Sequence, residues 1–253
     1  MAGVVAVTMI VGCKSWKTPT YKASQVAQSL RKMCAHDYKM TVETRHVGNN
    51  LQAFFWRVGL LRSGQLEMQP EAAESLERVL LCATRISLST DAPLQFLQVK
   101  MMDALTGATV TLWRFVPDIR DSMYTRLPED EYINRLVVEF DTSVAEKHRE
   151  WKEVHWDPPM TMPEFLAKQV VLRVKRQSPL GLQAHEDISN PAKLIVVLDN
   201  WSSIEKQGTK QQQKVTDLVE KTAKKVMSGY RYKGFREFEL KDPRGLALKS
   251  WAL

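Results

Sequence analysis

The sequence predicts an α+β fold, in which a largely antiparallel, mixed sheet is flanked by three to four helices. Segments with apolar residues at every second position, typical of strands, are interspersed with segments whose apolar residues recur every three or four positions, typical of helices. The two kinds do not alternate strictly, as they would in a doubly wound parallel fold. With 253 residues, 44% of them hydrophobic, the chain can bury one large core, so we expect a single domain over residues 1–253.

The first apolar segment, Val4–Val11, is rich in β-branched residues and predicts a buried central strand. Together with Ile10–Cys13 it also resembles a short signal segment that ends in a lipobox. No Lys or Arg precedes it, however, and it is shorter than the roughly 20 residues that cross a bilayer. We therefore expect a strand here, and no transmembrane segment.

A helix is expected after Thr18–Thr20, followed by a hairpin of Met40–His46 and Leu51–Leu61 around the turn residues 48–50. The helix has one apolar stripe, and its residues recur at three- and four-residue steps: Ala23, Val26, Ala27, Leu30, Met33 and Cys34.

Pro70 marks the start of a second helix, because proline is favoured in the first helical turn. A second hairpin is predicted from Leu94–Met102 and Thr109–Val116, and further strands from Arg135–Asp141 and Gln169–Arg176. In the last of these, Val, Leu and Val alternate with Arg and Lys.

The C-terminal part has an entirely apolar strand, Leu194–Leu198, which we expect to be central, and a long helix, Lys210–Met227, which we expect Gly229 to cap. The segment Val144–His155, which precedes this strand in the chain, is ambiguous, although some of its apolar residues fit a helical stripe. The long helix places an apolar face opposite a basic one, whose members are Lys210, Lys214, Lys221 and Lys225.

The net charge of +7 is unevenly distributed: residues 1–60 carry +6, residues 61–204 carry −5 and residues 205–253 carry +6. Such basic ends are typical of a surface that binds a polyanion, and they could equally attract the acidic middle of a neighbouring copy. An ordinary solvated surface is the third interpretation.

Three cysteines, far apart and without a C-x-x-C pair, argue against a disulfide framework and favour a reducing intracellular location, cytoplasmic or nuclear. The sequence has no phosphate-binding loop, no dinucleotide fingerprint, no H-E-x-x-H and no G-x-S-x-G. His148 and His155, seven residues apart, would lie too far apart on a helix to chelate one ion. We therefore expect no catalytic residue, no metal site and no cofactor.

One weak nuclease pattern is present, because Glu239-Leu240-Lys241 resembles the E-x-K half of the metal-dependent nuclease core. Asp199, at the end of another strand, would supply the second carboxylate for a Mg²⁺ ion. The alternative is a solvated strand end.

Residues 230–236 alternate aromatic and cationic side chains, a pattern that lets rings stack on bases while cations meet phosphates. Lys233-Gly234-Phe235 resembles the start of the RNP1 octamer of RNA-recognition modules, and the resemblance ends at Arg236 and Glu237. The alternative is that the aromatic residues anchor a final strand in the core.

From these patterns we expect a non-enzymatic nucleic-acid-binding or assembly protein, RNA-binding in particular, that uses basic surfaces at its chain ends. The expected contacts are Lys210, Lys214, Lys221, Lys225, Tyr230, Arg231, Tyr232, Lys233 and Arg236. The first alternative is a self-assembling structural subunit, such as a viral matrix- or coat-like protein or a component of a large complex. Its basic ends would contact the acidic middle of a neighbouring copy or an acidic membrane surface. The second alternative is the metal-dependent nuclease.

Overall fold

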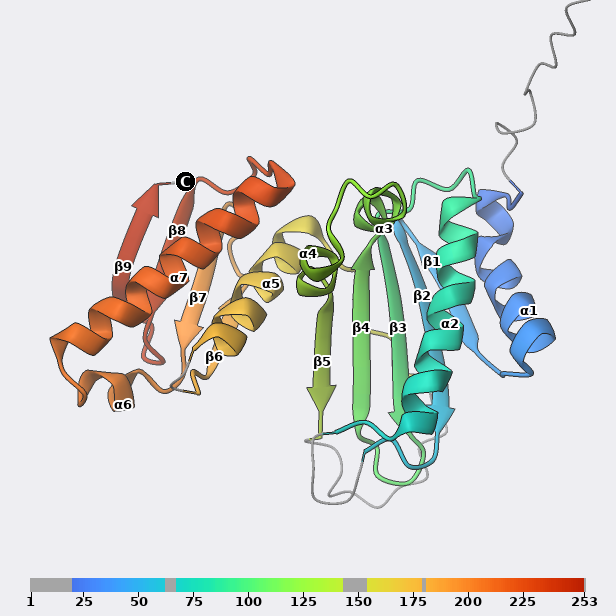
Figure 1. The fold of residues 1–253 in the computed structure, drawn as a ribbon, viewed down its shortest axis with the longest axis horizontal. Coiled ribbons are helices and arrows are strands. Elements are labelled where there is room, and N and C mark those ends of the chain that lie inside the picture. Colours follow the sequence, from blue (N-terminus) through green and yellow to red (C-terminus); the bar gives the residue numbers. More distant parts are fainter. Residues whose placement is uncertain (1–19, 62–66, 143–153, 179–180, 253) are drawn as a thin grey trace, which may run out of the picture.

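The computed structural model describes residues 20–61, 67–142, 154–178 and 181–252. It contains two β-sheets with helices packed on them, so the α+β class predicted from the sequence is confirmed. The strands are divided between two sheets, where the sequence had suggested one. Figure 1 shows the sheets side by side, with α5 between them. We call residues 20–142 the N-terminal lobe and residues 162–252 the C-terminal lobe.

The N-terminal lobe has a five-stranded sheet in the order β1-β2-β3-β4-β5. Only β2 and β3 pair in parallel; the other neighbours are antiparallel. The five strands are Glu43–Val47, Asn50–Arg57, Phe96–Asp103, Thr109–Phe115 and Val137–Asp141. Both predicted hairpins are present, as β1–β2 and β3–β4.

Two helices, α1 (Val26–Tyr38) and α2 (Pro70–Leu88), cover one face of this sheet. The apolar stripe predicted for the first helix is its buried side, where Val26, Leu30 and Cys34 are fully buried. The second helix begins at Pro70 as predicted. Two short helices, α3 (Val116–Met123) and α4 (Glu129–Asn134), connect β4 to β5.

The C-terminal lobe has a four-stranded sheet in the order β6-β7-β8-β9, again with one parallel pair, β7–β8, between antiparallel pairs. Its strands are Ala184–Asp187, Lys193–Leu198, Glu237–Lys241 and Ala247–Ala252. As predicted, the apolar strand β7 is interior, because it has a neighbour on each side. The lobe's helices are α5 (Met162–Gln177), α6 (Trp201–Glu205) and α7 (Thr209–Tyr230), and α5 and α7 share a core with the sheet.

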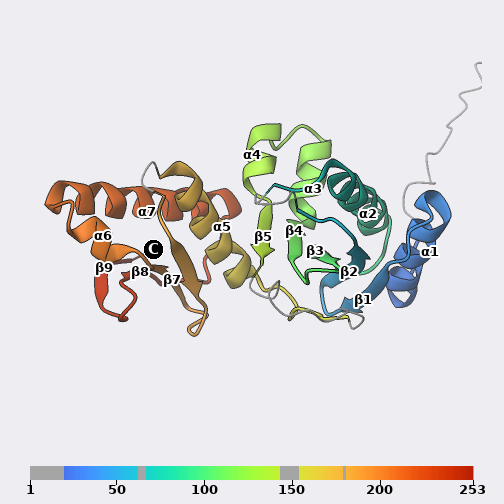
Figure 2. The ribbon, with the colours of Figure 1, turned by 90° about the horizontal axis from the view of Figure 1, so that it is seen from below.

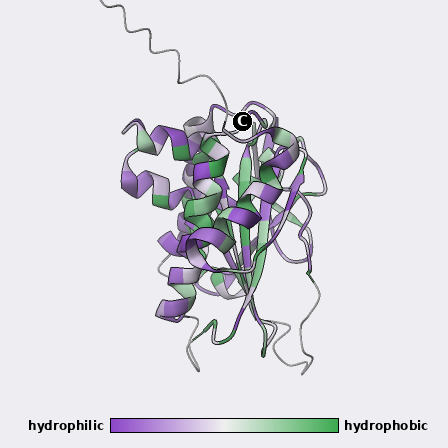
Figure 3. Cartoon of the chain, turned by 90° about the vertical axis from the view of Figure 1, so that its right-hand side faces the viewer, coloured by the Kyte–Doolittle hydropathy of each residue, from purple (hydrophilic) through white to green (hydrophobic). Residues whose placement is uncertain are grey.

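The two lobes repeat one arrangement of elements. Each has a helix, an antiparallel strand pair, a second long helix and another antiparallel pair, and in each the middle two strands are parallel. The N-terminal lobe adds β5 at one edge. Figure 2 shows α2 and α7 on the same side of their respective sheets. Figure 3 shows hydrophobic colour along the strands and stripes of it on the helices, as expected for elements that bury one side.

The strand predicted for Gln169–Arg176 is wrong, because these residues belong to helix α5. Their apolar residues fit a period of two, but Leu166, Val170 and Val174 also repeat every four positions and are the buried side of the helix. The Thr161 side chain accepts a hydrogen bond from the Glu164 backbone N–H and caps this helix. The helical period prevails because it buries one continuous stripe.

The prediction that Gly229 caps α7 is wrong. The helix continues through Tyr230, and Arg231 is the capping residue, in the left-handed conformation with φ of 51°. Two further predictions, the strand Val4–Val11 and most of the helix Val144–His155, fall outside the described residues.

The lobes meet across a third apolar cluster, on the sheet face opposite α1 and α2. Phe96, Trp113 and Val137 of that face pack against Phe165 of α5. The segment that precedes α5 runs along the same face (Figure 2), where the carbonyl oxygen of Asp157 accepts a hydrogen bond from Arg45. Helix α5 is therefore buried on both sides, by its own lobe and by the other.

Candidate functional site

The basic face predicted for the long helix is present on α7. Lys210, Lys214, Lys221 and Lys225 are all exposed. Among the described residues none of their ammonium groups has a hydrogen bond or an ion pair. The opposite side of the helix is buried in the C-terminal core, through Val215, Val219, Ala223 and Val226. The same spacing that buries these residues leaves the four lysines in water.

Three more of the predicted cations follow the helix. Arg231, Lys233 and Arg236 are exposed and, within the described ranges, form no ion pair. The turn at Arg231 directs the chain away from the helix axis. We call the seven cations together the basic C-terminal surface: Lys210, Lys214, Lys221, Lys225, Arg231, Lys233 and Arg236. Lys224, also on α7, differs from them because its ammonium group lies 2.6 Å from Glu220.

Tyr230 does not lie on this surface but between the lobes. Its hydroxyl donates a hydrogen bond to Asp118 of α3 at 2.7 Å and accepts one from Gln169 of α5 at 2.6 Å. Its ring packs edge-on against Phe115 and Phe165. Burial, and then the adjacent Asp118 carboxylate, raise the pKa of its phenol. This position corresponds to the core-anchor alternative for Tyr230.

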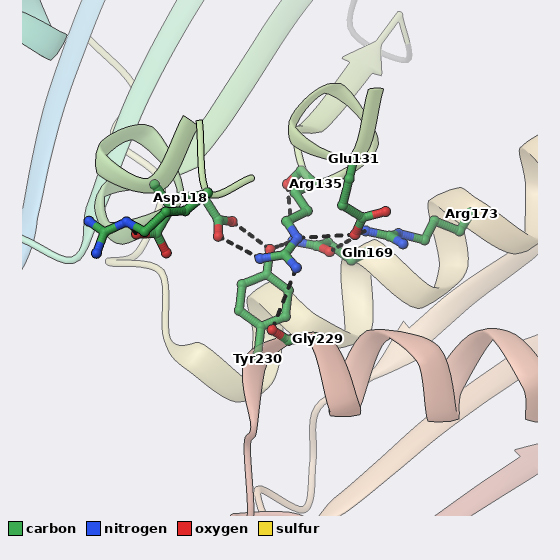
Figure 4. A network of polar contacts seen from close by, with 9 residues as sticks. Asp118, Glu131, Arg135, Gln169, Arg173, Gly229 and Tyr230 are labelled. Carbon is green, nitrogen blue, oxygen red and sulfur yellow. Dashed lines mark hydrogen bonds and ion pairs between the residues drawn. The ribbon is translucent and has the colours of Figure 1, made fainter. Parts of the chain in front are cut away.

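The polar groups around Tyr230 form one network, drawn in Figure 4. The Arg135 guanidinium lies 4.6 Å from the centre of the Tyr230 ring and 2.7 Å from the Asp118 carboxylate. Glu131 accepts hydrogen bonds from Arg135 and from Arg173 of α5, both at 3.0 Å. The network thus joins α3 and α4 of one lobe to α5 and α7 of the other.

The pKa values of the two carboxylates in the network, Asp118 and Glu131, shift in opposite directions. Asp118 is almost completely buried, and burial raises its pKa despite the bonds from Tyr230 and Arg135. Burial would also raise the pKa of Glu131, but the hydrogen bonds from Arg173 and Arg135 outweigh it and lower that pKa. The Glu131–Arg173 contact is therefore stabilising for the charged form of the carboxylate.

Tyr232, the other predicted stacking residue, is half-buried at the end of α7. Its ring packs edge-on against Phe235, with 5.2 Å between the ring centres. Both tyrosines are half-buried, but Tyr230 is fixed between the lobes, whereas Tyr232 lies in the segment that carries Arg231, Lys233 and Arg236.

A polar cleft lies between the start of α5 and the face of the N-terminal sheet that is opposite α1 and α2. It was not predicted from the sequence. Its volume is about 250 Å³. The Lys100 ammonium lies 2.6 Å from Asp157, and that of Lys168 lies 2.6 Å from Glu139 and 2.7 Å from Glu186. Burial opposes the charge of Lys168, yet its hydrogen bonds to the two glutamates raise its pKa. Both lysines are already neutralised, so the cleft offers a polyanion no free cation from these two positions.

The only sequence signal for this cleft was the alternation in β3, where Gln98 and Lys100 stand between apolar neighbours. It indicated that one face of the strand is polar. It could not indicate Asp157, which meets Lys100 from 57 residues away.

The described residues include no group of three or more His, Cys, Asp or Glu side chains that could hold a metal ion. Asp199 pairs with His185 at 2.8 Å, while Glu239 lies 3.8 Å from Lys193 and 3.6 Å from Lys241. Asp199 is thus paired with a histidine, and Glu239 lies near two lysines, one of which is the Lys241 of the nuclease pattern itself.

In the part of the chain that the structure describes, no helix is both long and apolar enough to cross a membrane. No known protein family, curated protein or solved structure matches this chain.

Proposed function

We propose that this protein is a non-enzymatic nucleic-acid-binding protein that holds single-stranded RNA against its basic C-terminal surface. The observation that carries the proposal is the row of four exposed lysines on α7, none of which has an acidic partner among the described residues. At a rise of 1.5 Å per residue, the row from Lys210 to Lys225 is about 22 Å long. A flexible strand can follow a row of this length and place several phosphates beside it.

Binding of this kind is dominated by the release of counterions. Each phosphate neutralised on a single strand contributes about 0.7 to the slope of log K against log salt concentration. Contacts from the four lysines alone would give a slope of about −3. The further cations Arg231, Lys233 and Arg236 would make it steeper.

The test is fluorescence anisotropy with a labelled single-stranded RNA at several salt concentrations. Changing Lys221 and Lys225 together to Glu should weaken binding for all sequences and make the slope shallower by about 1.4 units. The matched control changes Lys22 and Lys32 to Glu, which alters the net charge equally at exposed positions of the N-terminal lobe. Equal losses in both variants, or undiminished binding by the α7 variant, would contradict the proposal. Binding to acidic vesicles but not to RNA would indicate a membrane surface instead.

Self-assembly is a second candidate, supported by the acidic start of α4. Glu129 and Asp130 are exposed there, in the acidic middle of the chain. They could meet the basic C-terminal surface of a neighbouring copy. This predicts larger species at low salt and smaller ones at 1 M salt, where the Debye length is about 3 Å. Light scattering that gives one mass at all salt concentrations would exclude it.

An intracellular, reducing location completes the proposal. The odd number of cysteines supports it, as do Cys34 and Cys82, which are buried and free. Recovery of the native protein with its thiols reduced, from the soluble cell fraction, would agree with this location.

A further inference from the structure

A pocket of about 560 Å³ opens at the C-terminal end of α7, beside the basic C-terminal surface. It lies among the last turns of the helix, the segment that leads to β8, and the end of β9. Its lining residues are Lys224, Met227, Ser228, Arg231, Tyr232, Lys233, Phe235 and Ala252. The volume is within the range of about 300–1,000 Å³ that is usual for small-ligand sites, whereas the polar cleft at α5 is below it.

The pocket combines apolar walls with free cations. Met227 and Phe235 are buried, and the Tyr232 ring stands edge-on to Phe235. Arg231 and Lys233 are exposed and have no ion pair within the described residues. This composition fits a ligand with a flat, largely apolar part and an attached anionic group.

Gly234 allows the Tyr232 ring to take this position. A Cβ atom at residue 234 would overlap the Tyr232 hydroxyl and ring, so any residue other than glycine would displace the ring from this position. Burial raises the pKa of the Tyr232 phenol. The ring is therefore held at the pocket wall by its neighbours.

We propose that this pocket receives one nucleobase of the bound strand, with the base against Tyr232 and its phosphate at Arg231 and Lys233. The inference rests on the proposed function and adds to it a site for a base. A nucleotide fits because aromatic rings stack on bases and cations contact phosphates, and here both stand at one opening. Since aromatic stacking is tolerant of sequence, we expect the pocket to accept different bases.

The test compares two labelled strands of equal length and charge, one of ordinary RNA and one in which every base is absent. The parent protein should bind the strand with bases about 5- to 150-fold more tightly, as expected for one stacked base. Replacing Tyr232 by Ala should remove that preference and leave the salt slope unchanged, because the cations are retained. Replacing Tyr232 by Phe, which keeps the ring, should preserve the preference.

The possible outcomes separate this inference from the proposed function. If the parent binds both strands equally, with a steep salt dependence, the pocket inference is wrong and polyanion binding stands. If the parent binds neither strand, the proposed function fails and the inference fails with it. Because the comparison of strands is made on the parent protein, the result does not depend on whether the Ala variant folds.

Discussion

Replacing Tyr230 by Phe removes one hydroxyl from the contact between the lobes and keeps the ring that packs there. The hydroxyl donates to the Asp118 carboxylate and accepts from Gln169. A hydrogen bond to a charged group contributes about 1.5–3 kcal/mol and a neutral one about 0.5–1.5 kcal/mol. Both partners keep another bond, Asp118 to Arg135 and Gln169 to the Arg135 carbonyl oxygen. We therefore expect a loss of about 2 kcal/mol in the free energy of unfolding.

For a chain of this length, 2 kcal/mol corresponds to a decrease in Tm of about 4–8 °C. The measurement is urea denaturation together with a thermal melt. The matched control is Tyr232 to Phe, because no hydrogen bond of the Tyr232 hydroxyl is present among the described residues, and we expect its effect to stay below about 0.5 kcal/mol. If the Tyr230 variant were as stable as this control, the hydroxyl would not join the lobes as the structure indicates.

Three further predictions concern stability and thiols. Because the folded-state pKa of Glu131 lies below 4.5, its stabilising contribution is present above pH 4.5 and is lost as the pH falls through the folded-state pKa. Replacing Glu131 by Gln should lower the free energy of unfolding by about 3 kcal/mol at pH 7. It should also make that free energy less dependent on pH, as measured by urea melts between pH 3 and 7. Cys34 and Cys82 are both buried away from solvent, so in a Cys13 to Ser background neither thiol should react with Ellman's reagent until urea unfolds the protein. The predicted single domain requires one cooperative transition, and limited proteolysis that released two separately folding lobes would contradict it.

The sequence alone predicted the helices and strands whose buried side follows from their own periodicity. The period of the long helix determined both its apolar stripe and its row of lysines, since 100° per residue fixes which side chains share a face. The two hairpins were predictable because turn residues separate strands that are neighbours in the chain. The exposure of the lysines follows from the local periodicity of α7 alone, because burying the apolar stripe turns the opposite face to solvent.

Only the tertiary structure decided the features that depend on distant partners. Residues 169–176 satisfy both the helical and the strand period, and the contacts of α5 with both lobes select the helix. The role of Tyr230 depends on Asp118, 112 residues away, so the alternation of aromatic and basic residues could not distinguish an anchor from a stacking ring. The division into two sheets was hidden for the same reason: strand periodicity shows which face of a strand is buried, and not which strand lies beside it.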